Sequence, residues 1–223
     1  MKVSVLNLVP LRHGESFKDA MDAMVRLAKR VEDLGYTRYW IAEHHNMRSI
    51  ASSATQLLIQ HTLANTKKIR VGSGGVMLPN HSPYLIAEQY GTLETLYPNR
   101  VDLGLGRAPG TDVPTAMALR RTKDLKTDFE RDLAELSGYF KGSNYVQAYP
   151  AHGLYLPFYI LGSSTDSAYL AAKLGLPYSF AAHFAPTMME NAIAIYNRYF
   201  QPSAILDKPY VILGVNAILA DTD

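Results

Sequence analysis

The sequence predicts an α/β fold in which parallel strands are joined by crossover helices. Short runs of β-branched and aromatic residues alternate along the chain with longer stretches whose apolar residues recur at helical spacing. This alternation is typical of either a doubly wound sheet or a (β/α)8 barrel, and periodicity alone does not separate the two. Because no linker interrupts the pattern, we expect one domain over residues 1–223.

Local signals place each element in turn. Ser16 is a typical N-cap for the first helix and Gly35 a typical terminator, while Ser82 followed by Pro83 marks the start of the third helix. The predicted strands are 3–9, 36–42, 69–72, 101–105, 158–161, 178–181 and 210–219. The predicted helices are 17–34, 53–65, 83–97, 128–139, 165–174 and 187–200. Residues 107–157 are too many for one plain crossover, so we expect an excursion over one rim there.

Composition excludes several classes of protein. The 22 Lys and Arg residues exceed the 20 Asp and Glu residues by only two, so no large field of one sign attracts nucleic acid or anionic lipid. The chain has no cysteine, which excludes disulfides and thiolate zinc sites. No apolar run approaches the roughly 18 residues of a membrane span, and no convincing signal peptide is present. We therefore expect a cytoplasmic protein that binds small molecules, without nucleic-acid or membrane partners.

Polar side chains follow the second predicted strand directly. Glu43, His44, His45 and Asn46 could not all remain unpaired in a core, so they should line the mouth of a pocket at the strand's carboxyl end. His44 is a candidate hydrogen-bonding group or base, although a structural histidine is the alternative. Adjacent His44 and His45 point to different sides of an extended chain, and no second ligand pair follows at helical spacing. We expect no metal site.

Two strand ends have the chemistry of anion sites. The turn 104–110 cannot be a dinucleotide fingerprint, because Pro109 replaces its third glycine and no capped helix is expected directly behind it. Its backbone amides and Arg107 suit a phosphate, and an ordinary surface arginine is the alternative. The second turn passes from a strand through Gly162 into a helix N-terminus, where three hydroxyls could add donors to a phosphate or simply cap the helix. These hydroxyls belong to Ser163, Ser164 and Ser167.

Three glycines at the end of the third strand also require a reason. Gly72, Gly74 and Gly75 weaken a strand, so they indicate either close approach of the backbone to a flat ligand or a loose bulge.

Four segments taken together, 40–46, 71–83, 102–110 and 161–164, closely resemble the bacterial-luciferase-like flavin-dependent monooxygenases, in particular the single-chain luciferase-like oxidoreductases. The resemblance implies a (β/α)8 TIM-type barrel that binds FMN at its carboxyl-terminal rim. It also implies that a separate flavin reductase supplies reduced FMNH2, which reacts with O2. Members of this family are about one and a half times as long as this chain. The eighth strand and the final β/α unit are therefore missing here, either because the chain is a fragment or because it is a naturally short relative.

The resemblance also assigns roles to residues. Arg107 and the turn with Ser163 and Ser164 match the groups that hold the FMN phosphate, and His44 matches a catalytic histidine near the flavin. The Gly74–Gly75 bond matches a cis peptide beneath the isoalloxazine ring. The implied function is FMN-dependent monooxygenation of an unidentified small organic substrate. A non-catalytic flavin-binding protein and a deazaflavin-dependent dehydrogenase are the alternatives.

We also expect a homodimer, as in the family that the sequence resembles. The second and third predicted helices contain apolar residues distributed too widely for one core-facing stripe. These residues are Leu57, Leu58, Ile59, Leu63, Leu85, Ile86 and Leu93.

Overall fold

The structure is a computed structural model that describes residues 1–120, 123–124, 126 and 128–217. The chain divides into two compact units, Met1–Pro157 and Phe158–Asp223. Strands alternate with helices in both units, and each strand pairs in parallel with the next one inside its unit. The predicted α/β class is confirmed as an incomplete TIM-barrel type, with seven strands in the described residues. The expectation of a single domain stays a prediction.

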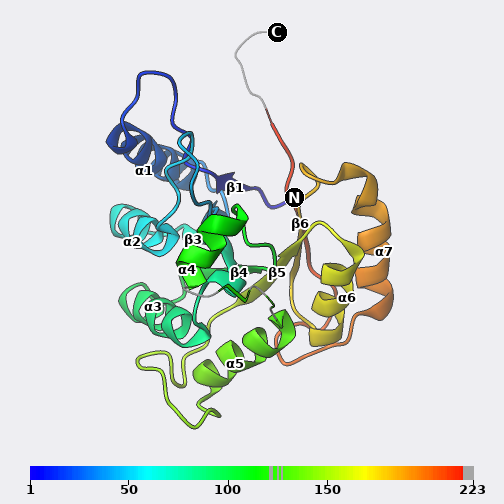
Figure 1. The fold of residues 1–223 in the computed structure, drawn as a ribbon. Helices are drawn as coiled ribbons and strands as arrows, with labels where there is room; N and C mark the ends of the chain where they lie inside the picture. Colours follow the sequence, from blue (N-terminus) through cyan, green and yellow to red (C-terminus); the bar gives the residue numbers. More distant parts are fainter. Residues whose placement is uncertain (121–122, 125, 127, 218–223) are drawn as a thin grey trace. The chain divides into compact units, whose positions relative to one another are not determined.

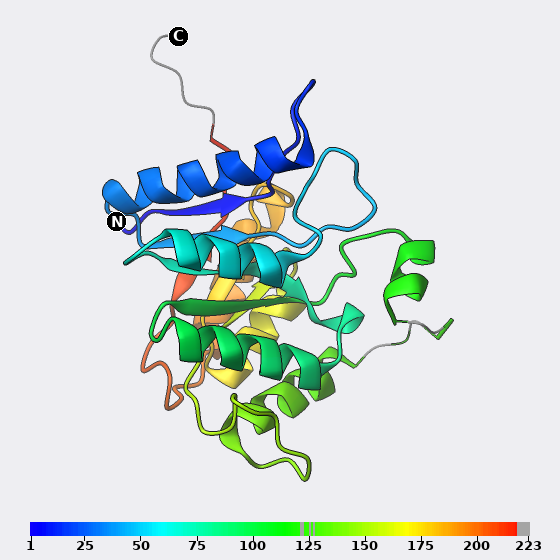
Figure 2. The same cartoon turned by 90° about the vertical axis from the view of Figure 1, so that its left-hand side faces the viewer.

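The first unit contains four parallel strands in chain order. Helices α1, α2 and α3 lie side by side along one face of these strands, as Figure 1 and the turned view of Figure 2 show. The strands are β1 (Ser4–Asn7), β2 (Arg38–Ile41), β3 (Arg70–Met77) and β4 (Val101–Gly106). The helices are α1 (Phe17–Asp33), α2 (Thr55–Asn65), the short η1 (Leu78–Asn80), α3 (Pro83–Leu96), α4 (Val113–Arg120) and α5 (Phe129–Lys141).

The second unit repeats the pattern with three strands. Helices α6 and α7 pack against each other within this unit (Figure 1). Its strands are β5 (Phe158–Gly162), β6 (Tyr178–Phe180) and β7 (Val211–Leu213), and its helices are α6 (Thr165–Leu174), η2 (Pro186–Met188) and α7 (Met189–Tyr199). In the described part of the chain, no helix combines the length and the apolar character that crossing a membrane requires.

Most predicted elements are confirmed, and the differences have local causes. Ser16 caps α1 in a reciprocal capping box with Asp19, as its position indicated. The sequence analysis missed α4 and was wrong to expect no capped helix behind the glycine-rich turn, because the Asp112 side chain accepts a hydrogen bond from the Thr115 backbone N–H at 3.0 Å. The last predicted strand was too long, and residues 218–219 at its end lie outside the described residues.

The residues between β4 and β5 cover part of α3. A Cβ added to Gly91 on α3 would lie 2.5 Å from the backbone nitrogen of Ala151, so only glycine allows the two segments to approach this closely. Tyr84 on α3 also meets Tyr139 on α5 edge to face, with 5.3 Å between ring centroids. The long segment therefore packs against α3 through close contacts.

Burial within the single chain removes most of the sequence argument for a dimer. Among the seven apolar residues used in that argument, Leu58, Ile59, Leu63, Ile86 and Leu93 are buried within the single chain. Leu57 and Leu85 are exposed, at 72% and 52%. Of the seven residues, these two remain available to a partner.

A buried carboxylate joins three strands near their amino ends. Asp102 on β4 is 0% exposed, and it accepts hydrogen bonds from Arg38 at 3.1 Å, Trp40 at 3.0 Å and Arg70 at 2.7 Å. On β3, a Cβ on Gly72 would collide with the Asp102 carbonyl oxygen, so glycine permits the close approach of β3 and β4. The anion and the glycine together fix the spacing of β2, β3 and β4.

Replacing Asp102 with alanine should lower the free energy of unfolding by about 3–5 kcal/mol, because a buried guanidinium loses its carboxylate partner. Urea denaturation measures this change. The control is Asp22→Ala, which removes an exposed helical pair with Lys18 whose side chains are 43% and 80% accessible, and which should change stability by less than about 0.5 kcal/mol. Similar losses in the two variants would contradict the role given to Asp102.

Candidate active site

The candidate site lies where β2, β3 and β4 end in the first unit. Just beyond β2, Glu43 is fully buried, His44 and His45 are half-buried, and Asn46 is exposed. The carboxyl ends of parallel strands are the usual location of active sites in this fold class. The polar residues that follow β2 are therefore well placed to meet a ligand.

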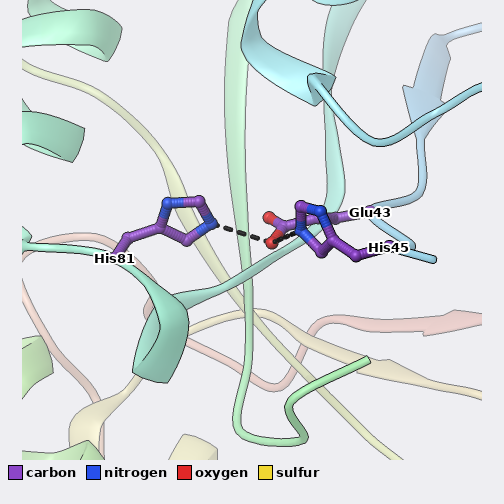
Figure 3. A group of neighbouring side chains, drawn as sticks. All are labelled: Glu43, His45 and His81. Atoms are coloured by element: carbon purple, nitrogen blue, oxygen red, sulfur yellow. Dashed lines mark hydrogen bonds and ion pairs between the residues drawn. The ribbon is translucent and has the colours of Figure 1, made fainter. Parts of the chain in front are cut away.

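Glu43, His45 and His81 form a hydrogen-bonded group that we call the Glu43 cluster. The Oε1 atom of Glu43 lies 2.9 Å from the Nε2 atom of His45 and 2.8 Å from the Nε2 atom of His81. Figure 3 shows the two imidazoles on opposite sides of the carboxylate, both directed at the same oxygen. The other carboxylate oxygen, Oε2, accepts the backbone N–H of Met77 at 3.1 Å. The buried carboxylate thus has partners for both of its oxygens.

These partners determine the charge of Glu43. Burial alone would raise the pKa of the Glu43 carboxyl, but hydrogen bonds from His45, His81 and the Met77 N–H outweigh burial and lower this pKa to about 2. The side chain is therefore a carboxylate at neutral pH, and it can only accept hydrogen bonds.

The same three side chains offer ligand atoms of the kinds that divalent cations bind, all within 4.8 Å of one another. The sequence analysis expected no metal site because His44 and His45 are adjacent, but the structure pairs His45 with the distant His81. Ligands of one tetrahedral zinc would lie roughly 3.3 Å apart, given bonds of 2.0–2.1 Å. The observed separations of 2.8 and 2.9 Å are those of hydrogen bonds.

His44 differs from its neighbour. Its backbone N–H donates to the Ser52 carbonyl at 3.4 Å. Within the described residues, no hydrogen bond or ion pair ends on its imidazole. The His44 ring is half-buried, and its two nitrogens are available to a ligand.

The strand β3 is irregular at two of its three glycines, Gly74 and Gly75. The Gly74–Gly75 peptide is cis, and the pairing register with β4 shifts between Ser73 and Val76. The Ser73 hydroxyl bridges the irregularity by donating to the Gly104 carbonyl at 2.9 Å and accepting the Gly104 N–H at 3.1 Å. A Cβ on Gly74 would lie 2.6 Å from a methyl carbon of Leu6. Close packing inside the protein is therefore itself a reason for glycine here.

Arg107 lies in the loop after β4, and its side chain is exposed. This loop is held by the exits of the neighbouring strands, since the Asn80 amide donates to the Pro109 carbonyl at 2.7 Å and the Thr111 hydroxyl donates to the His45 carbonyl at 3.3 Å. In addition, Asn46 donates to the Asp112 carboxylate at 2.9 Å. Side chains thus connect the segments that follow β2, β3 and β4.

In the second unit, the predicted anion turn is a capped helix start. Ser164 is the N-cap of α6, and its hydroxyl accepts the Ser167 N–H. The Ser167 hydroxyl lies 2.8 Å from the Ser164 carbonyl and 3.1 Å from the Tyr178 hydroxyl, and a Cβ on Gly162 would collide with it. Ser163 is exposed. Helix capping, the alternative to an anion site, is therefore observed here. The exposed Ser163 side chain and the N-terminus of α6 remain available to an anion.

Sequence reasoning did not identify the Glu43 cluster as a unit. It placed Glu43 at a pocket mouth and gave His81 no chemical role. The usable signal was the charge of Glu43, since a carboxylate directly after a buried strand requires donors. Nothing in the local pattern showed that one donor lies 38 residues further along the chain.

Proteins similar to this chain are known. An uncharacterized protein, YddN, of Bacillus subtilis is 56% identical over 225 residues, which cover 99% of this chain and 66% of YddN. A protein of Escherichia coli K12 described as a luciferase-like monooxygenase is 52% identical, with 99% of this chain and 67% of that protein covered. The chain therefore spans about two thirds of the length of these relatives.

Solved structures share the fold. The crystal structure of apo-MsnO8 matches 95% of this chain and 64% of its own, with a TM-score of 0.90 and 36% identity. The oxygenating constituent of 3,6-diketocamphane monooxygenase, in complex with FMN, matches with a TM-score of 0.73 at 18% identity over 91% of this chain and 64% of its own. An F420-dependent secondary alcohol dehydrogenase matches with a TM-score of 0.66 at 17% identity, over 89% and 63%. The last two show similarity of fold alone.

A family model agrees with these comparisons. The model described as luciferase-like monooxygenase matches residues 1–223. The resemblance found in the four sequence segments is thereby confirmed. The chain belongs to the luciferase-like monooxygenase family.

Proposed function

We propose that this protein is an FMN-dependent monooxygenase that uses reduced FMN and O2 to oxidise a small organic substrate. The observation that supports this most directly is the half-buried imidazole of His44 at the carboxyl end of β2, which follows the buried carboxylate of Glu43 in the chain. Family membership favours monooxygenation, and a fold relative binds FMN. When bound, the flavin would supply the activation of oxygen, while the protein positions the reactants and excludes water.

The residues fit a flavin in three respects. The cis Gly74–Gly75 peptide lies in the second half of β3, in the same unit as His44, and we propose that it contacts the ring. Arg107 in the first unit is an exposed cation that suits a phosphate. The N-terminus of α6 in the second unit, with Gly162, Ser163, Ser164 and Ser167, is a separate candidate for the phosphate.

His44 has a chemical role in this proposal. A neutral imidazole can donate a hydrogen bond from one nitrogen and take a proton at the other. Because no hydrogen bond within the described residues engages its imidazole, His44 can hold the reacting oxygen or accept a proton from the substrate. His45 and His81 are less suited, because their Nε2 atoms already bind Glu43.

A deazaflavin-dependent dehydrogenase is the second candidate, because an F420-dependent alcohol dehydrogenase shares the fold. A non-catalytic flavin-binding protein is the third. Oxygen uptake, hydride exchange and flavin binding, measured on the protein mixed with FMNH2 or reduced F420, separate all three. The monooxygenase should change the rate and the peroxide yield of FMNH2 oxidation. Hydride exchange with reduced F420 alone would favour the dehydrogenase, and tight FMN binding without any effect on oxidation would favour the binding protein.

We also propose a cytoplasmic homodimer that receives reduced flavin from a separate reductase. The exposed Leu57 and Leu85 support the dimer. Light scattering at micromolar concentration would contradict it by showing only a species of 24.8 kDa.

Replacing Arg107 with alanine should weaken FMN binding by roughly 1.5–3 kcal/mol, the value of a hydrogen bond to a charged group, and should leave riboflavin binding nearly unchanged. The reason is that riboflavin lacks the phosphate. Fluorescence titration of both flavins measures the difference, and Ser163→Ala tests the α6 turn in the same way. Equal losses for FMN and riboflavin in both variants would show that neither group binds the phosphate.

Replacing His44 with alanine should keep the FMN dissociation constant within about threefold, or about 0.7 kcal/mol, while lowering product yield about 100-fold, as expected for the loss of a general base. Stopped-flow absorbance and product analysis measure this effect. His61→Ala is the control, because His61 is exposed on α2. Unchanged product formation in His44→Ala would contradict the proposed role.

A further inference from the structure

The Glu43 cluster connects two strand ends through one carboxylate. Glu43 and His45 follow β2, whereas Met77 ends β3 and His81 follows η1. The side chains of Glu43, His45 and His81 are 1%, 13% and 22% accessible. The three hydrogen bonds to Glu43 therefore lie at the inner side of the candidate site, where they restrain the segment that contains His44.

These hydrogen bonds also determine where the imidazole hydrogens are. An ionised carboxylate has no hydrogen to donate, so the Nε2 atoms of both His45 and His81 must donate to it. In the neutral imidazoles, the hydrogen is then on Nε2 and the lone pair is on Nδ1. Burial of Glu43 strengthens this requirement, because a buried anion without donors is strongly disfavoured.

The same bonds restrain His44 through the backbone. His44 lies between two restrained residues. Glu43 bonds Met77 at the end of β3 and His81 just after η1, and the ring of His45 is held by Glu43 while its carbonyl accepts the Thr111 hydroxyl at 3.3 Å. Its own N–H is bonded to the Ser52 carbonyl. The main chain on both sides of His44 is thus fixed, while its imidazole is unengaged within the described residues.

We propose that Glu43 is a positioning residue that fixes His45 and His81 as Nε2–H donors and thereby holds His44 in place as the imidazole that meets the ligand. For catalysis this inference rests on the proposed function, whereas the statement on imidazole hydrogens does not. Glu43 itself touches neither substrate nor flavin in this proposal. It acts through its neighbours, as the outer carboxylates of other histidine sites do.

Glu43→Gln is the direct test, because it keeps the shape and replaces one acceptor oxygen with a donor group. Glutamine cannot accept from Met77, His45 and His81 together without a change at one of them. Two-bond nitrogen–proton NMR spectra of nitrogen-labelled protein should show Nε2–H imidazoles at His45 and His81 in the wild type, and Glu43→Gln should alter either these imidazoles or the Met77 amide. The exposed Glu190 provides the control variant Glu190→Gln, which should leave these signals unaltered. The proposal is overturned if either imidazole carries its neutral-form hydrogen on Nδ1 in the wild type, or if Glu43→Gln alters neither the histidine signals nor the Met77 amide.

Kinetics supply the second readout. Glu43→Gln should lower kcat at least tenfold, with KM and the FMN dissociation constant within threefold, because position and not binding is lost. The double variant Glu43→Gln with His81→Gln should be no slower than Glu43→Gln alone, since both act through one group. Additive losses would overturn the proposal. If the wild type does not oxidise FMNH2, the proposed function fails, and the NMR result still decides the assignment of the hydrogens.

Two further outcomes are decisive. If Glu43→Gln does not fold, His81→Gln replaces it. We then expect His45 to keep its Nε2–H form and kcat to fall, and a kcat equal to that of the wild type would overturn the proposal.

Titration with Zn²⁺ tests the metal alternative. Tight Zn²⁺ binding that is lost in His81→Gln would show that the three side chains hold a cation instead of forming two imidazole–carboxylate hydrogen bonds, and it would overturn the proposal.

Discussion

The strand arrangement of the first unit depends on the buried carboxylate of Asp102. This single anion on β4 accepts from Arg38 and Trp40 on β2 and from Arg70 on β3, so three adjacent strands share one acceptor. A second buried carboxylate, Glu43, plays a comparable part beyond the opposite ends of β2 and β3. The two carboxylates differ in the groups that donate hydrogen bonds to them. Guanidinium groups stay charged and suit a permanent bond, whereas imidazoles can change their protonation and suit a site of chemistry.

The order and type of most elements follow from sequence because they depend on neighbouring residues. Capping of α1 by Ser16 is an example, since its partner Asp19 is three residues away. The position of β3 was less predictable, because its last residues pair with β4 beyond an irregularity that the Ser73 side chain stabilises. The helix α4 was missed because its cap, Asp112, follows a glycine-rich turn that reads as a loop.

The candidate site was predicted in position but not in its internal contacts. An apolar strand that ends in charged and polar residues indicates a site, and that signal is local. The bond between Glu43 and His81 depends on how β2 and β3 align, which no pattern in one sequence specifies. The fold does not determine the cofactor, because an FMN protein and an F420 protein both share this fold at low sequence identity. Discrimination between them must come from individual side chains.

The contact between Gly91 and Ala151 limits how the long segment after β4 can vary. Because the backbone of Ala151 lies against α3 with no room for a Cβ on Gly91, residues around 151 form part of the wall that covers the helix. Tyr145, by contrast, is fully exposed, and Val146 beside it is more than half exposed. Substitutions at these two exposed positions should therefore disturb the packing less than substitutions near Ala151. An engineered binding surface could use the side chains of Tyr145 and Val146, while the flanking Asn144 and Gln147 keep their bonds to α5 and α3.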